Sequence, residues 1–194
     1  MPAWSELRRY EVIRAEAGES LSLPASADRR KIIVVTGSVE PSGQAMVERG
    51  ASIDIDREDD FSCVATESTV LVVMQGTWGD ETGKSGVFDP EDIPSPVEGD
   101  PAPYEKTTLF DNHYHDCDEY WVIVEGRGVG VSEGVHYELG PGDCLATRMG
   151  DHHDFPLVRE RVTAVFFETT LRGRRRLGHL WAHTHGTPDH GSER

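Results

Sequence analysis

Residues 113–126 read HYHDCDEYWVIVEG, and this stretch decides the fold. His113 and His115 are two positions apart, so in an extended strand both imidazoles project to one face and can converge on one point. Glu119 keeps the same parity if the intervening Asp-Cys-Asp forms a short loop. A further imidazole, His153, follows a second strand-and-turn pattern. Three imidazoles and one carboxylate on β-strands suit a divalent transition metal with open coordination positions.

The spacing His-x-His-x3-Glu-x6-Gly resembles the first motif of the cupin superfamily at every fixed position. The second cupin motif, Gly-x5-Pro-x-Gly-x2-His-x3-Asn, resembles the segment from Gly142 to Leu157, with two departures. Arg148 stands where the proline is usual, and Pro156-Leu157 stands where the asparagine is expected. Neither position is a metal ligand in the family, so the departures concern turn geometry more than the metal.

The resemblance implies an all-β fold, a double-stranded β-helix (jelly-roll) barrel, with one divalent metal ion. The implied ligands are His113, His115, Glu119 and His153. One alternative stays open, because a bulge after Gly150 that shifts the register by one residue exchanges the roles of His152 and His153. Fe, Mn, Ni or Co fits this nitrogen and oxygen set, with iron slightly favoured, and Zn fits it less well.

Composition limits the partners and the compartment. The net charge of −16 argues against non-specific nucleic-acid binding and against anionic membrane surfaces. No window approaches the roughly 18 apolar residues of a transmembrane helix, and the N-terminal residues lack the apolar core of a secretory signal. Three cysteines are too few and too scattered for a disulfide framework, so a cytoplasmic protein is expected.

Short β-branched and aromatic runs recur along the chain, separated by glycine, proline and acidic turns. They predict strands at 31–36, 51–55, 69–74, 120–124 and 162–167. Residues 4–15 fit either a short helix or a first strand. The glycines at 126, 128 and 130 are interpreted as a hairpin turn, because no helix follows them as a phosphate-binding loop requires.

A faint internal repeat suggests two cupin-like halves. Residues 32–37 resemble 121–126 at an offset of 89, and residues 70–73 resemble 162–165 at an offset of 92. The predicted organisation is a degenerate half at 1–76, a linker at 77–103, a metal-binding half at 104–170 and a basic, His-rich arm at 171–194. Similar valine runs in any β-barrel are the alternative explanation.

The two halves differ in chemistry. The repeat places Arg30 at the position of Glu119 and Phe61 at the position of His153, and the first 112 residues contain no histidine. The first half is therefore expected to lack a metal site and to serve a structural role. The arm is interpreted as docking on an acidic neighbouring subunit, with adventitious metal affinity.

Three apolar side chains share the inward parity of the ligands, namely Trp121, Ile123 and Phe155. They line either a substrate pocket or an ordinary barrel core. Arg148 binds a substrate carboxylate at the barrel mouth or is a solvated turn residue. The run 120–124 is apolar on both faces, which predicts cover from the first half or from a second subunit, and a homodimer is expected.

The ligand set favours an enzyme that acts on a small polar metabolite. Dioxygenase chemistry is slightly preferred, because the only general-base candidates are Glu125, Asp154 and His152 and none is compelling. The alternatives are a sugar or keto-acid isomerase, a lyase, and a non-catalytic module that binds a small molecule.

Overall fold

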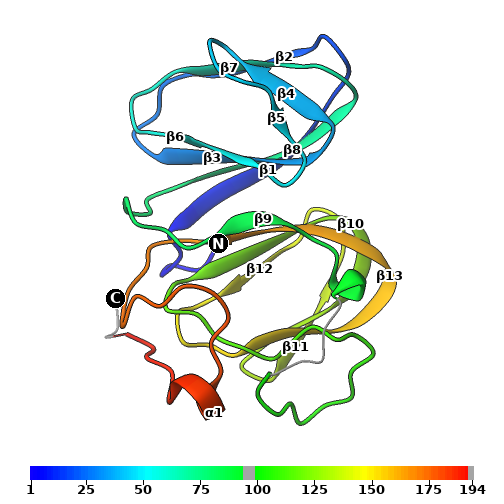
Figure 1. The fold of residues 1–194 in the computed structure, drawn as a ribbon, viewed down its shortest axis with the longest axis vertical. Coiled ribbons are helices and arrows are strands. Elements are labelled where there is room, and N and C mark those ends of the chain that lie inside the picture. The colour runs from blue at the N-terminus through cyan, green and yellow to red at the C-terminus, as the bar shows by residue number, and fades with distance from the viewer. Residues whose placement is uncertain (94–98, 192–194) are drawn as a thin grey trace. The chain divides into compact units, whose positions relative to one another are not determined.

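The computed structural model describes residues 1–93 and 99–191. Parts of the expected linker (94–98) and of the expected arm (192–194) lie outside the described residues. The chain divides into two compact units. The first contains residues 6–78 with Met1 and Ser85–Val87, and the second contains Pro2–Ser5, Gly79–Lys84 and residues from Phe88 onward. Figure 1 shows that both units consist mainly of strands. The all-β prediction is confirmed.

The first unit has two four-stranded sheets. In the first sheet the strand order is β1 (Leu7–Ala15), β8 (Thr69–Gly76), β3 (Arg29–Thr36) and β6 (Ser52–Ile55). In the second sheet it is β2 (Ser20–Leu23), β7 (Phe61–Ala65), β4 (Ser38–Pro41) and β5 (Val47–Glu48). Residues 61–65 alternate between buried and exposed, so a period of two directs one face of β7 inward. Buried residues of both sheets form one apolar core. Residues 7–15 of the ambiguous N-terminal segment are a strand.

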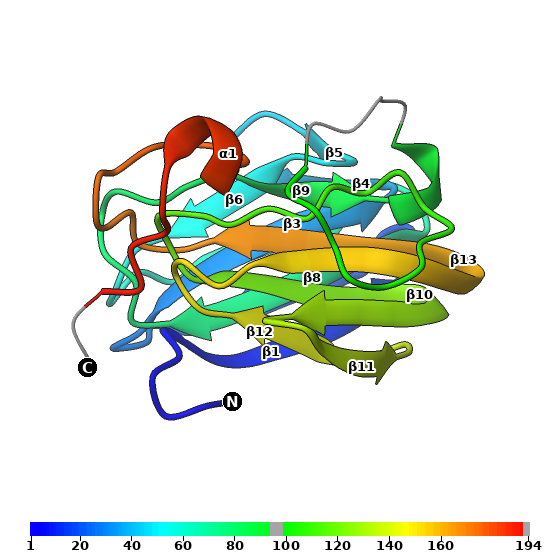
Figure 2. The ribbon, with the colours of Figure 1, turned by 90° about the horizontal axis from the view of Figure 1, so that it is seen from below.

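The second unit is organised around two long antiparallel strands, β10 (Glu119–Ser132) and β13 (His153–Glu168), which run side by side in Figure 2. Within the second unit the strand order is β11 (Val135–Leu139), β10, β13, and β12 (Cys144–Thr147) also pairs with β10. The strand β9 spans Ser85–Phe88, most of which belongs to the first unit. Two short helices complete the second unit, the 3-10 helix η1 (Pro90–Asp92) and α1 (Ala182–His185). No helix in the described parts of the chain is long and apolar enough to cross a membrane.

The expected hairpin turn at the three glycines is wrong. Residues 126–130 lie inside β10, whose pairing with β13 shifts register repeatedly from Ile123 to Val131. Such irregularities bend a strand pair. The turn follows at Glu133-Gly134, before β11. Gly126 has a φ of 80°, and a Cβ there would lie 1.9 Å from the carbonyl oxygen of Arg161. The glycines therefore serve close strand approach, which composition alone does not distinguish from a turn.

We predict that Gly126→Ala is markedly destabilising. The substitution combines a left-handed backbone, which costs about 1–2 kcal/mol, with a backbone clash that requires the strands to separate. Gly134→Ala is the matched control, because Gly134 has a φ of 74° and open space around it. Urea unfolding followed by tryptophan fluorescence measures both. Equal losses of unfolding free energy in the two variants would contradict the close-approach argument.

Candidate metal centre

Four polar side chains predicted as ligands lie close together inside the second unit. Glu119 begins β10 and His153 begins β13. His113 precedes β10 and is fixed beside His153 by an isolated β-bridge. His115 follows two residues later, so its ring reaches the same side. At least one ligand atom from each of the four residues lies within 4.8 Å of the others, and all four side chains are buried.

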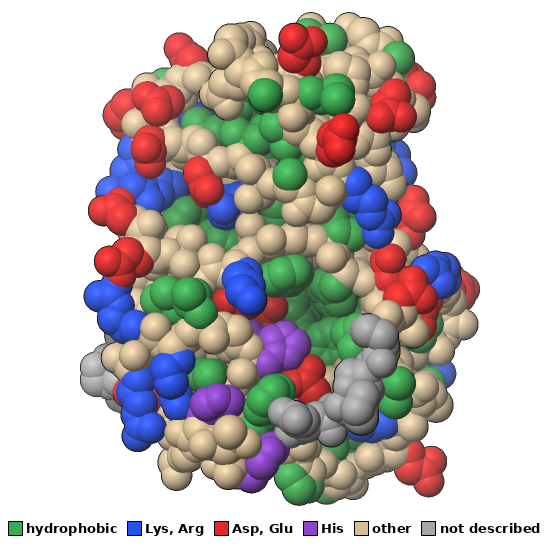
Figure 3. Space-filling model, viewed as in Figure 1, with side chains coloured by type: hydrophobic (Ala, Val, Ile, Leu, Met, Phe, Trp, Pro, Cys, Tyr) green, Lys and Arg blue, Asp and Glu red, His purple; other side chains and the backbone are tan. Residues whose placement is uncertain are grey.

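The imidazoles meet through their Nε2 atoms. His113 Nε2 lies 3.0 Å from His115 Nε2, and Glu119 Oε2 lies 3.3 Å from His115 Nε2 and 2.8 Å from His153 Nε2. Adjacent ligands on a metal with bonds of about 2.1 Å are about 3 Å apart, so these spacings fit a single ion. Figure 3 shows histidine side chains reaching the surface of this unit beside a recess lined by hydrophobic side chains.

Three backbone carbonyls hold the opposite nitrogens. His113 Nδ1 donates to Asp111 O at 2.9 Å, His115 Nδ1 to Gly178 O at 3.0 Å, and His153 Nδ1 to Asp151 O at 2.9 Å. A carbonyl oxygen only accepts, so each Nδ1 carries a hydrogen and each neutral ring presents a lone pair at Nε2. This is the outer-shell arrangement that orients histidine ligands in metal sites.

The inward atoms need a cation. Glu119 Oε2 and His153 Nε2 are buried, and neither has a hydrogen-bond partner among the described residues although they lie 2.8 Å apart. Both atoms present lone pairs, as do the facing Nε2 atoms of His113 and His115 in their neutral forms. Acceptors forced together in a dry interior are costly unless a proton or a metal ion lies between them. The donor set therefore fits one divalent metal ion.

The pKa shifts of the clustered histidines and of Glu119 also indicate a site for a cation. Burial lowers the pKa of His113 to about 3, with a further contribution from His153. Burial also opposes charge on His115, but the adjacent Glu119 carboxylate outweighs it and raises the pKa of His115. Burial opposes ionisation of Glu119, and His115 overcomes it and holds the Glu119 pKa well below its usual range. A proton and a metal ion thus compete for His115.

Glu168 was not singled out from the sequence. It lies directly across from Glu119 in the β10–β13 pair and is buried, with one oxygen 4.0 Å from His115 Nδ1 and the other accepting from the Lys84 amide at 2.9 Å. It shares its parity with Ala164 and Phe166, which face the core, but not with His153 and Phe155, because register shifts interrupt the β10–β13 pairing. Cys117 completes an overlapping group with His115 and Glu168. Burial raises the pKa of the Cys117 thiol, so it is a poor thiolate ligand.

The expected pocket residues are buried together. Trp121, Ile123 and Phe155 belong to one apolar core cluster, and the Trp121 ring centre lies 5.3 Å from that of His153. They form the apolar floor beside the four-residue cluster. Arg148 is half-buried and has no ion-pair partner within the described ranges.

His152 faces away from the four-residue cluster. Its Nε2 lies 2.8 Å from Asp100 Oδ2, whereas the His153 ring lies among the other predicted ligands. The structure therefore gathers the set that contains His153, and the register shift that would exchange the two histidines does not occur.

The C-terminal arm packs on its own unit. Leu180 forms a β-bridge with Tyr114, and Arg176 pairs with Asp116, whose side chain is fully buried. The His179 ring stacks on His113 at a centroid distance of 3.7 Å, and its Nδ1 lies 2.9 Å from Asp111 Oδ1. The described residues of the arm therefore contribute to the walls of the candidate centre, and docking of the arm on a neighbouring subunit stays a prediction.

Comparisons with known proteins agree with this fold. No protein-family model matches the chain. An AerE structure from Microcystis aeruginosa covers 82% of the chain and 86% of its own length at 10% identity and a TM-score of 0.54. The structure of an IolB-like protein from Salmonella typhimurium covers 91% of the chain and 88% of its own length, at 15% identity and a TM-score of 0.53. The structure of an oxalate decarboxylase mutant from Bacillus subtilis covers 89% of the chain and 70% of its own length, at 9% identity and a TM-score of 0.58.

The fold is the cupin-type jelly-roll barrel that the sequence predicted, and a buried cluster of three histidines and one glutamate lies inside it. At the level of sequence, the chain is 43% identical to the uncharacterized protein y4oW of Sinorhizobium fredii, over 100% of this chain and 92% of that protein. The chain belongs to the same family as y4oW.

We predict that His153→Ala abolishes stoichiometric metal binding and that His152→Ala preserves it. The two residues are adjacent, but only His153 presents Nε2 to Glu119. Elemental analysis of anaerobically purified, tag-free protein measures the metal content, with wild type and both variants prepared in parallel. Equal metal content in the two variants would contradict the four-residue assignment.

Metal affinity is predicted to fall as the pH decreases. The His115 pKa is raised above its ordinary value of 6.5, so a proton occupies the site below that raised pKa and must leave before a metal binds. Where His115 is protonated, the apparent affinity should fall by about tenfold per pH unit. Competition with a chromophoric chelator, from pH 8 downward, measures it. An affinity that stays constant to pH 5 would contradict this competition.

Proposed function

We propose that the protein is a metal-dependent enzyme that acts on a small polar metabolite through a mononuclear centre of three histidines and one glutamate. The observation that carries the proposal is the set of three Nδ1-to-carbonyl hydrogen bonds, which leave all three Nε2 lone pairs directed at one point beside Glu119. A merely degenerate barrel has no reason to retain this arrangement, because each buried unsatisfied acceptor costs about 1–3 kcal/mol.

Four protein ligands leave coordination positions for a substrate on a metal that prefers six. When bound, the ion supplies Lewis acidity and, if it is iron or manganese, redox chemistry. Glu119 contributes a single negative charge, so an M²⁺ centre keeps a formal charge of +1 and favours an anionic or enediol substrate. Trp121 and Phe155 exclude water from one side, and the recess in Figure 3 is the proposed approach.

The charged neighbours favour oxygenase chemistry over proton-transfer chemistry. Among the general-base candidates, Glu125 is exposed and His152 is bound to Asp100. Asp154 is fully buried and engaged by Lys106 at 2.7 Å and by Tyr104 at 3.1 Å. Isomerisation needs a free base within reach of the substrate, whereas a dioxygenase draws its reactivity from the metal. We therefore favour a dioxygenase-type reaction with iron.

A non-oxidative reaction on a small carboxylate is the second candidate. It is favoured by the formal positive charge of the centre. The fold similarity to oxalate decarboxylase, one of whose structures is described with Mn(II) centres, makes manganese and oxalate reasonable additions to a screen. The fold itself does not choose the reaction.

We predict dioxygen consumption by the iron-loaded protein with at least one member of a panel of diols, thiols and keto acids. His153→Ala should lower the rate by about a hundredfold or more, and His152→Ala should retain most of it. An oxygen electrode measures uptake, and protein loaded with zinc is the matched control for metal without redox activity.

Carbon dioxide release from oxalate or another carboxylate without net dioxygen uptake would replace the oxygenase by the second candidate. Full metal content with no turnover across the panel, with either iron or manganese, would instead support a small-molecule-binding module.

A further inference from the structure

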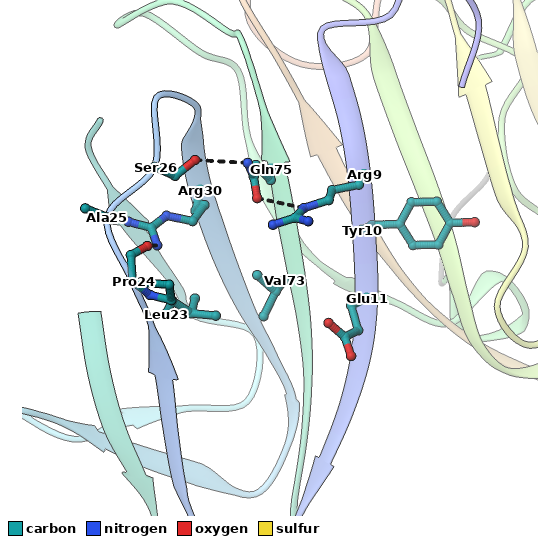
Figure 4. Close-up of a pocket in the computed structure, with 10 residues that line it drawn as sticks. All are labelled: Arg9, Tyr10, Glu11, Leu23, Pro24, Ala25, Ser26, Arg30, Val73 and Gln75. Carbon is teal, nitrogen blue, oxygen red and sulfur yellow. Dashed lines mark hydrogen bonds between the residues drawn. The ribbon is translucent and has the colours of Figure 1, made fainter. Parts of the chain in front are cut away.

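The first unit contains a polar cavity at one end of its apolar core. The cavity has a volume of about 260 Å³, slightly below the range of about 300–1,000 Å³ that is usual for small-molecule sites. Arg9, Arg30, Gln75, Ser26 and Glu11 contribute its polar lining, and Leu23, Pro24 and Val73 contribute apolar surface. Figure 4 shows these side chains reaching into the same space from β1, β3, β8 and the segment that follows β2.

Three of these residues form a row across the sheet. Gln75 of β8 is the register partner of both Arg9 in β1 and Arg30 in β3. The next residues on the same face are Val73 and Ile32, which belong to the apolar core, so the row lies on the inner face. Arg9 Nε donates to Gln75 Oε1 at 2.8 Å, and the Gln75 amide donates to Ser26 Oγ at 3.0 Å.

In the second unit, the corresponding strand pair places Glu119 opposite Glu168 in the same way. In the repeat predicted from the sequence, Arg30 of the first unit takes the position that Glu119 occupies in the second. The absence of histidine from the first 112 residues therefore does not by itself exclude a binding site in that unit.

Arg30 carries a buried charge without a carboxylate partner. The residue is 3% exposed, and its guanidinium donates to the carbonyl oxygens of Pro24, at 2.5 Å, and of Asp59. Its Nε has no hydrogen-bond partner within the described residues, and no carboxylate there lies at ion-pair distance. An uncompensated buried cation costs several kcal/mol, and a bound anion removes that cost.

Arg9 supplies the direct contact. Among the described residues its Nε alone is engaged, by Gln75, so the two terminal nitrogens are available for a bidentate interaction with a planar anion. Two carboxylates lie nearby. Asp28 accepts from the Gln75 amide at 3.1 Å, and Glu11 lines the cavity two positions along β1 from Arg9. A ligand that binds both Arg9 and Glu11 therefore carries a carboxylate, which accepts from Arg9, and a hydroxyl, which donates to Glu11.

We propose that this cavity binds a small hydroxycarboxylate, with its carboxylate on Arg9 in the field of Arg30 and a hydroxyl on Glu11. The site is separate from the candidate metal centre and does not depend on the reaction proposed for that centre.

The test uses zinc-loaded, full-length protein and L-malate as the probe. Arginine Nε–Hε correlations in ¹⁵N-edited NMR report the cavity directly. Malate is expected to shift the Arg9 and Arg30 signals in a saturable manner, and succinate, which lacks the hydroxyl, is expected to bind more weakly.

Arg9→Gln is expected to weaken malate binding by about tenfold or more, as the loss of a charge-assisted hydrogen bond implies. Arg8→Gln is the matched control, because Arg8 is the exposed neighbour of the same charge, and it should leave the affinity within about twofold. Because Arg9 is also exposed, its substitution leaves the apolar core intact, which Arg30 substitutions do not guarantee.

His153→Ala distinguishes this cavity from the metal centre, which also attracts carboxylates. Persistence of the Arg9 and Arg30 shifts in that variant supports the proposal. Loss of the shifts in His153→Ala, equal effects of Arg8→Gln and Arg9→Gln, or the lack of saturable shifts with malate would each overturn it.

Discussion

The second unit depends on a conflict between lone pairs. Each of the three histidines donates its Nδ1 hydrogen to a backbone carbonyl, and this forces the Nε2 lone pairs toward one another and toward the Glu119 carboxylate. In a water-excluded interior this arrangement is unfavourable unless a positive charge lies at its centre. The bends of β10 and β13, the glycines that permit them and the packing of the arm all serve to hold these groups in place.

Much of this could be predicted from local sequence. A period of two places His113 and His115 on one face, and the inward parity of Trp121 and Ile123 follows from the same rule. The all-β class followed from short β-branched runs. Other features could not be predicted this way, because they depend on partners distant in sequence. Glycine in a strand and glycine in a turn have the same composition, and only the carbonyl of Arg161 beside Gly126 distinguishes them.

Glu168 and Arg30 show the same limit in two forms. Both are charged residues near the end of a strand. The role of each depends on the residue opposite it in the sheet, and its neighbours in sequence do not reveal that residue. Register places Glu168 opposite Glu119 and Arg30 opposite Gln75. The assumption that the first unit is only structural followed from counting histidines. The structural role stays a prediction, and the proposed anion site is an alternative that a count of histidines does not detect.

The carbonyl of Gly178 has a consequence for the order in which the protein matures. It fixes His115 although it lies 63 residues further along the chain, beyond both long strands. A ribosome that has produced the whole barrel has therefore not yet produced the group that orients this imidazole. Until Gly178 leaves the exit tunnel and the arm packs, His115 lacks this acceptor, whereas His113 and His153 already have theirs at Asp111 and Asp151. The orientation of all three imidazoles is thus complete only after the chain has been synthesised past Gly178.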